Sequence, residues 1–210
     1  MKTSNSPKLQ IIFSTLKEFG LLLESGQKFP SISGLIAGEP IRGSWWSHLK
    51  GQEIFEVLQQ VGDHEDVLIA KLLSGKVTFV HRKLWCEVLV IGQAREPWQL
   101  SKLSAAALVL LRQVDSQGSL QTNSMEWPTE FKSTKPGDAV RELEKRLLVE
   151  TEQFHTPSGD HAKRIQTWKR WAEQRDLKCK SISLEDAKRK LEDRVADLNG
   201  QFSASAKLPW

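Results

Sequence analysis

The chain has 210 residues, of which 39% are hydrophobic and 27% are charged, so it is long enough to bury a sizeable core. No apolar run is long enough to predict a membrane-spanning helix, and the N-terminus lacks the pattern of a secretory signal. The formal net charge of +4 is a mild basic bias, which alone does not predict nucleic-acid binding. We therefore expect a cytoplasmic protein that makes no membrane contact.

The first 97 residues predict an α+β domain. Apolar residues recur at the three- and four-residue spacing of an amphipathic helix, and Ser31 is placed to cap a short helix that ends at Ala37. Ser74-Gly75 is a two-residue link that suits a β-hairpin. The predicted elements are helices over residues 8–24, 31–37, 52–61 and 81–92, and strands over residues 67–73 and 76–80.

Residues 98–175, which follow a boundary loop at 94–98, predict a winged helix-turn-helix. Their expected order is helix, short strand, helical turn, helix and β-hairpin, which is the winged-helix order. These elements fall at residues 104–114, 120–122, 128–131, 136–147 and 148–165. Residues 176–210 add a charged helix from Ser183 and a tail, and no internal repeat is evident. The overall prediction is a mainly helical α+β fold.

In this interpretation residues 138–147 form the helix that enters the major groove, and the hairpin reaches an adjacent groove or the backbone. Glu142 and Glu144 weaken the DNA hypothesis, because phosphates would repel both. A winged helix can also be a protein-interaction module, and that alternative stays open. The predicted nucleic-acid contacts are Arg141, Lys145 and Arg146 on the helix and Ser158, His161, Lys163 and Arg164 on the wing.

The basic excess is local. Residues 161–180 carry seven Lys and Arg against two acidic residues, a net charge of +5. This run favours a nucleic-acid surface, with a solvated helix face as the alternative. A second predicted cluster surrounds the hairpin turn and suggests an anionic partner such as phosphate, or simply exposed charges. Its members are Lys71, Lys76, His81 and Arg82.

Trp45 and Trp46 are adjacent, so in a helix their side chains would point about 100° apart. We expect one to pack in the core and the other to cover a surface. An exposed indole can stack on an unpaired base, although packing is the simpler role.

Catalytic and metal motifs are scarce. The sequence has no GxSxG, Walker A, HExxH or GxGxxG pattern, and its five histidines lack metal-ligand spacing. Cys86 lies in an apolar stretch and is far from Cys179, so we interpret it as a small core residue. We predict no metal and no cofactor, and an enzyme is not our first choice.

Two blocks carry a family resemblance. Residues 143–149 (Leu-Glu-Lys-Arg-Leu-Leu-Val) and 155–163 resemble the winged-helix part of AlkZ-like proteins, which include bacterial DNA glycosylases that remove alkylated or crosslinked bases. Residues 74–82, with Gly43-Ser44-Trp45-Trp46 upstream, are similar to small bacterial proteins related to that group. The resemblance implies DNA binding and a link to DNA repair.

The same resemblance implies base excision less strongly. The glycosylases are considerably longer than this chain and use a Gln-x-Gln or Gln-x-Asp element to position water at the sugar, and we carry over no catalytic residue. Our first hypothesis is therefore a winged-helix protein that binds duplex DNA. The alternatives are a glycosylase acting on alkylated or crosslinked bases, and a protein-interaction module that uses Trp45, Trp46 and residues 183–201.

Overall fold

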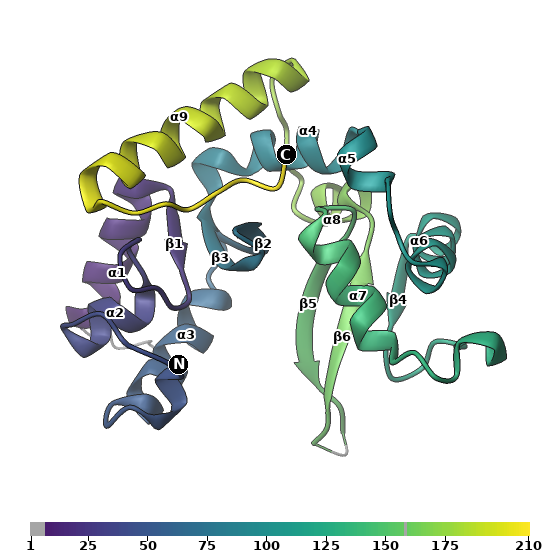
Figure 1. The fold of residues 1–210 in the computed structure, drawn as a ribbon, viewed down its shortest axis with the longest axis horizontal. Helices are drawn as coiled ribbons and strands as arrows, with labels where there is room; N and C mark the ends of the chain where they lie inside the picture. The colour runs from purple at the N-terminus through teal and green to yellow at the C-terminus, as the bar shows by residue number, and fades with distance from the viewer. Residues whose placement is uncertain (1–6, 158) are drawn as a thin grey trace. The chain divides into compact units, whose positions relative to one another are not determined.

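The computed structural model describes residues 7–157 and 159–210 and has the predicted α+β fold. Helices accompany two small antiparallel sheets of three strands each (Figure 1). The chain divides into two compact units: unit 1 comprises Met1–Trp85 and Lys188–Leu208, and unit 2 comprises Cys86–Ala187 and Pro209–Trp210. The three-part division drawn from the sequence stays a prediction. Within the described residues, no helix is long and apolar enough to cross a membrane.

Unit 1 is built on a sheet with the strand order β1-β3-β2. Both strand pairs of this sheet are antiparallel, and β2 and β3 form the predicted hairpin. Its elements are α1 (Pro7–Phe19), β1 (Leu21–Leu23), α2 (Ile32–Ala37), the 3-10 turn η1 (Trp45–Ser47), α3 (Gly51–Gly62), β2 (Val67–Leu73), β3 (Lys76–His81) and the 3-10 turn η2 (Arg82–Leu84).

The helix predicted over residues 8–24 ends early, and this part of the prediction is wrong. Gly20 takes a left-handed φ of 81°, and a Cβ there would lie 2.8 Å from Leu84 Cδ1. The three leucines that follow form β1, and all are buried. Because β1 is covered on both faces, its sequence lacks the alternation of a half-exposed strand.

Local signals elsewhere in unit 1 were accurate. Ser31 caps α2, because its Oγ accepts a hydrogen bond from the Gly34 N–H at 3.2 Å. Ser74 and Gly75 both have positive φ angles, 52° and 68°, which is the backbone of a tight two-residue hairpin turn. The hairpin prediction is confirmed.

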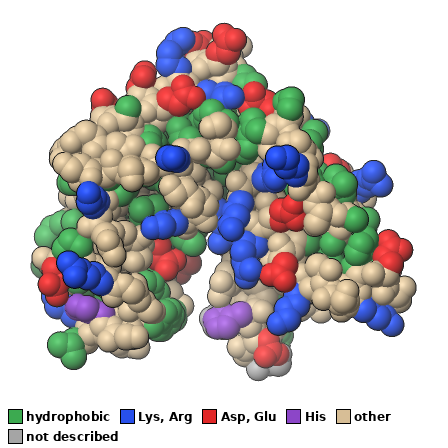
Figure 2. Space-filling model, in the orientation of Figure 1, with side chains coloured by type: hydrophobic (Ala, Val, Ile, Leu, Met, Phe, Trp, Pro, Cys, Tyr) green, Lys and Arg blue, Asp and Glu red, His purple; other side chains and the backbone are tan. Residues whose placement is uncertain are grey.

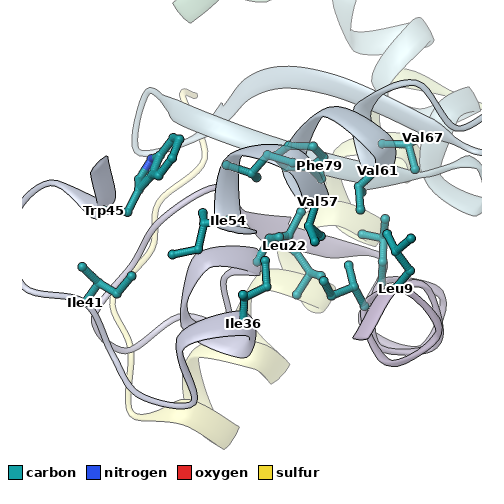
Figure 3. Packing of buried hydrophobic residues seen from close by; sticks show 14 residues of the cluster. Leu9, Leu22, Ile36, Ile41, Trp45, Ile54, Val57, Val61, Val67 and Phe79 are labelled. Carbon is teal, nitrogen blue, oxygen red and sulfur yellow. The ribbon is translucent and has the colours of Figure 1, made fainter. Parts of the chain in front are cut away.

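The core of unit 1 joins α1, α2 and α3 to the sheet. Figure 3 shows Leu9 near Val61 and Val67, and Trp45 at the other end of the cluster near Ile41 and Ile54.

Unit 2 has a second sheet, ordered β4-β6-β5, with a core formed by α6, α7 and the strands. In Figure 1 the β5–β6 hairpin extends beyond the helices of this unit. Its elements are α4 (Trp85–Gln93, whose first residue belongs to unit 1), α5 (Pro97–Leu100), α6 (Ala105–Gln117), β4 (Ser119–Gln121), the 3-10 turn η3 (Thr129–Phe131), α7 (Pro136–Lys145), β5 (Glu150–His155), β6 (His161–Gln166) and α8 (Trp168–Gln174). Helix α9 (Leu184–Phe202) begins in unit 2 and continues into unit 1.

The loop expected at residues 94–98 is shorter than predicted, since α5 begins at Pro97. Glu96 and Gln99 form a reciprocal capping box, and Pro97 occupies the first turn, where a missing N–H costs nothing. The capping box and Pro97 together stabilise the short helix α5 in a segment that the sequence predicts to be a loop.

The two units repeat one chain path, which the sequence did not reveal. Residues 7–81 of unit 1 and 105–166 of unit 2 both run helix, strand, helical segment, helix, strand, strand, with the additional turn η1 in unit 1, and in each sheet the last strand lies between the other two. The second helical segment is α2 in unit 1 and the shorter η3 in unit 2. The two units therefore share a topology although their sequences show no evident repeat.

The two cysteines are bonded to each other, so the interpretation of Cys86 as a free core residue is wrong. Helix α4 places Cys86 beside the segment after α8, where its Cα lies 5.6 Å from that of Cys179. The pair lies 93 positions apart, and no local sequence signal predicts such a bridge.

Candidate nucleic-acid interface

Helix α7 presents two basic side chains to solvent. Pro136 occupies its first turn, and Ala139, Val140 and Leu143 turn inward to the unit 2 core. Arg141 and Lys145 are exposed on the other side, four residues apart, so they lie on one face of the helix. The Arg141 Nη1 is 2.9 Å from Asp138 Oδ1, an exposed pair within the same helix.

The two glutamates of α7 are both engaged within unit 2. Glu142 accepts hydrogen bonds from the Ser104 N–H at 3.0 Å and the Ser104 hydroxyl at 2.7 Å, at the start of α6. Glu144 is buried, accepts a hydrogen bond from Thr151 Oγ1 at 2.7 Å, and pairs with Lys163. Neither glutamate stands beside Arg141 and Lys145 as an unpaired exposed charge.

Two of the predicted contact residues, Lys163 and Arg146, have partners within unit 2. Lys163 Nζ pairs with the buried Glu144, and its side chain is only 35% exposed. Arg146 donates from Nη1 to the Trp98 carbonyl, and its own carbonyl accepts from Gln99 Nε2 at 3.1 Å. Both side chains hold α7 to the rest of unit 2.

The β5–β6 hairpin carries the remaining predicted contacts. His161 is exposed, and its Nδ1 lies 2.8 Å from Gln153 Nε2. Arg164 pairs with Glu152, which lies directly opposite it in the ladder. Ser158 lies outside the described residues.

Sequence analysis missed two lysines beside α7. Lys132 and Lys135 are exposed, and Lys135 stands at the N-cap position of the helix. They add two exposed cations to the chain immediately before α7. The available signal was their position immediately before a predicted helix start.

The basic run at residues 161–180 is partly neutralised. Lys178 lies 3.3 Å from Asp176, and Lys169 lies 4.0 Å from Glu173. Lys169 and Arg170 line a cavity of about 520 Å³ that also contains the ion pair of Arg95 with Asp115, whose Nη2–Oδ1 distance is 2.6 Å. Figure 2 shows Lys and Arg side chains on the visible face with Asp and Glu side chains lying among them.

The structure does not gather the four basic residues predicted around the first hairpin. In the β2–β3 ladder, Lys76 lies opposite Leu73 at the turn, whereas His81 lies opposite Val67 at the other end of the strands. Arg82 is held by Asp66, with 2.8 Å between Nη1 and Oδ1, and Lys71 also has an interaction partner within the structure. Burial, reinforced by the positive charges of Lys83, Lys17 and Arg82 and opposed by Asp66, lowers the pKa of His81.

The tryptophan pair divides as expected. Trp45 is buried and donates from Nε1 to Glu24 Oε1 at 2.8 Å, while Trp46 is 61% exposed. The two rings stack with 4.2 Å between centroids, and Phe55 lies 5.2 Å from Trp46. Leu49, three residues after Trp46, is fully exposed.

A buried carboxyl near the base of the second hairpin was also missed. Glu150 lies opposite Gln166 in the ladder and accepts a hydrogen bond from Gln166 Nε2 at 2.8 Å. Burial raises the pKa of Glu150 to about 7; Glu152 adds to the rise, and the Gln166 hydrogen bond, Arg164 and Arg175 oppose it. Nothing in a strand sequence marks which glutamate will be buried.

Two sequence triplets match the Gln-x-Asp pattern of the glycosylases, Gln113-Val114-Asp115 and Gln174-Arg175-Asp176. The first lies inside α6, where side chains two residues apart point in nearly opposite directions. The second ends α8, and Asp176 there is paired with Lys178. The first triplet therefore does not direct its amide and its carboxylate to one site, and no catalytic residue is assigned from either triplet. The described residues also contain no group of three His, Cys, Asp or Glu side chains that could hold a metal ion.

A family model described as AlkZ related matches residues 10–207 of the chain. The match covers both units and agrees with the resemblance drawn from residues 143–149 and 155–163 and from residues 43–46 and 74–82. Comparison with curated proteins and with solved structures gave no match.

Proposed function

Since this chain belongs to the AlkZ-related family, we propose that it binds duplex DNA through a winged helix in unit 2. In this proposal α7 is the recognition helix and the β5–β6 hairpin is the wing. The order α6, β4, η3, α7, β5, β6 supports this assignment, because it is the order of a winged helix-turn-helix. A role in DNA repair is the biological setting that the family suggests.

The observation that carries the proposal is the separation of charge on α7. Its basic side chains, Arg141 and Lys145, are exposed, while Glu142 binds the start of α6 and Glu144 is buried against Lys163. The exposed charges of α7 are thus these two cations and Asp138, which pairs with Arg141, so the repulsion of phosphate expected from Glu142 and Glu144 is reduced.

The equivalent helix of unit 1 gives a useful contrast. Helix α3 contains no Lys or Arg, and its exposed residues are Gln52, Glu56, Gln59 and Gln60. The two units share one chain path, but only α7 has basic side chains on its exposed surface. The contrast favours unit 2 as the DNA-binding unit.

The test is duplex binding by fluorescence anisotropy at about 50 mM and about 200 mM salt, with wild type and Arg141→Ala/Lys145→Ala. Each lost phosphate contact should reduce the slope of log affinity against log salt by about 0.9, so the double variant should bind more weakly and with a shallower slope. Lys17→Ala/Arg112→Ala removes two exposed cations from α1 and α6 and is the matched control. Equal losses in the two variants would refute α7 as the contact helix.

Lys163 is a poor choice for this experiment. Its replacement by alanine leaves Glu144 buried without its ion-pair partner, which costs stability whether or not DNA binds. Weak binding by such a variant would therefore not distinguish a lost contact from a damaged fold.

Protein interaction is a second candidate, favoured by Trp46 and Leu49. Both are large apolar side chains left exposed in unit 1, and Phe55 extends the same surface. Trp46→Ala/Leu49→Ala should leave duplex affinity unchanged if this surface serves a protein partner. A parallel loss of duplex affinity would instead make the surface part of the DNA contact.

A further inference from the structure

A pocket of unit 1 has the composition of an anion site. It has a volume of about 380 Å³ and lies among the loop at residues 25–29, the β2–β3 turn and the segment at residues 204–206. This volume is within the range of small-molecule sites, about 300–1,000 Å³. Among the described residues that line it, the charged ones are Lys28 and Lys76, and none is acidic. We propose that this pocket binds the phosphate group of a phosphomonoester.

The two lysines are available to a ligand. Both are exposed, and the part of the chain that the structure describes offers neither ammonium a hydrogen-bond or ion-pair partner. Other lysines of unit 1 are engaged: Lys8 pairs with Glu53, and Lys50 donates to the Ile36 and Ala37 carbonyls. An incoming anion therefore does not have to displace an internal carboxylate.

Uncharged donors surround the lysines. Ser25, Gln27 and Ser205 line the pocket. Gly26 and Gly43 also line it and have no side chain to block approach to the backbone. A phosphate carries about −1.5 to −2 charges on three terminal oxygens, so it can use more of these donors than a carboxylate can.

The size of the pocket favours an ester over bare phosphate. Its volume of about 380 Å³ is within the range of small-molecule sites and leaves room for the organic part of a phosphomonoester beside the phosphate group. Leu23, Phe29, Ile41 and Leu73 also line the pocket but are almost fully buried, so polar groups supply most of its contact surface.

The C-terminal wall is held in place by specific hydrogen bonds. The Ser74 N–H donates to the Lys207 carbonyl at 2.7 Å, and the Lys207 N–H donates to Ser74 Oγ at 3.1 Å. Asn199 binds the Ala206 backbone at both of its amide atoms, each at 2.9 Å. The pocket is thus a preformed feature, in which little ordering has to accompany binding.

The experiment is calorimetric titration of the full chain with thymidine 5′-monophosphate, thymidine and inorganic phosphate. We expect thymidine 5′-monophosphate to bind more tightly than inorganic phosphate and thymidine not to bind. Lys28→Gln/Lys76→Gln should weaken binding by about tenfold or more, the scale of a lost charge-assisted hydrogen bond. Lys28→Arg/Lys76→Arg keeps both charges and should stay near wild type, as should the control Lys17→Gln/Arg112→Gln. Equal binding of thymidine and its monophosphate, no binding at all, or wild-type affinity in the Gln variant would overturn the proposal.

A second arm separates the two sources of a phosphomonoester. Single-stranded oligonucleotides with a 5′-phosphate or a 5′-hydroxyl are compared with thymidine 5′-monophosphate. Preference for the phosphorylated strand over the mononucleotide identifies a strand end, and equal affinity identifies a small phosphorylated molecule; both support the shared chemistry. The Arg141→Ala/Lys145→Ala variant should retain mononucleotide binding, so the failure of this inference and that of the duplex proposal can be distinguished.

Discussion

Glu150 makes the stability of unit 2 depend on pH. Burial raises its pKa to about 7 from an ordinary value of 4.5, so the folded state keeps a proton that the unfolded chain releases. The free energy of unfolding should therefore fall as pH rises from about 4.5 to about 7 and level off above, with a total loss of up to about 3 kcal/mol.

Glu150→Gln tests this directly by urea unfolding at pH 5 and pH 8. Glutamine cannot ionise, and its amide supplies a donor near Gln166 Oε1, a buried acceptor with no hydrogen bond among the described residues. The variant should be more stable than wild type at pH 8 and similar at pH 5. The exposed Glu130→Gln should follow wild type at both, and a Glu150→Gln profile that also follows wild type would show that Glu150 titrates normally.

The roles of single residues could be predicted where a side chain interacts with residues close to it in the sequence. The cap at Ser31 and the division of Trp45 from Trp46 follow from local geometry, and both were expected. Contacts across the fold were not accessible, because the pairing of Lys163 with Glu144 joins residues 19 positions apart on two different elements. That contact makes Lys163, a predicted DNA contact, the partner of a buried charge, which the sequence did not indicate.

At the scale of elements, Ser104 connects α6 to α7. Its Oγ accepts from the Ala107 N–H at 3.1 Å as an N-cap and donates to Glu142 Oε2 at 2.7 Å. Ser104→Ala removes both bonds and should lower the free energy of unfolding by about 1–2 kcal/mol. Denaturant unfolding is the measurement, and the exposed Ser133→Ala, which lies in a turn, should change stability by less than about 0.5 kcal/mol. Comparable changes in both variants would mean that Ser104 does not serve as a cap.

Most helices and strands could be predicted because their ends carry chemical signals. Ser104 and Gly118 bound α6, and Ser74-Gly75 turns the first hairpin. Strand β1 could not be predicted, because its three consecutive buried leucines continue the apolar pattern of the preceding helix. Its strand conformation depends on pairing with β3, which lies nearly 60 residues further along the chain.

At the scale of the molecule, the Cys86–Cys179 bond closes a long loop within unit 2. In the chain-entropy description, a loop of 93 residues contributes up to about 4–5 kcal/mol by restricting the unfolded state. Reduction of the wild type, or the Cys86→Ser/Cys179→Ser variant, should lower the midpoint of thermal unfolding. The variant should not respond to reductant. A wild-type protein that shows two free thiols in a quantitative assay before reduction would contradict the bridge.

Both units have the same topology, but the sequence predicted a winged helix only in the second half, because strand β1 of the first half was not recognised. The second half shows the expected order of elements directly, whereas in unit 1 the sequence of β1 continues the apolar pattern of the preceding helix. Once β1 is recognised, the same order emerges in residues 7–81. The two corresponding helices differ in charge, so similarity of chain path does not imply similarity of ligand.

Unit 1 is assembled from both ends of the chain, and this has a consequence for biosynthesis. A ribosome delivers the chain from its N-terminus, so Lys188–Leu208 emerge only after all but the last two residues of unit 2. The unit that starts first is therefore completed late, and residues 86–187 are free to fold while residues 1–85 still await their C-terminal helix. Translation that stopped before Lys188 would release a chain whose first unit lacks the greater part of α9.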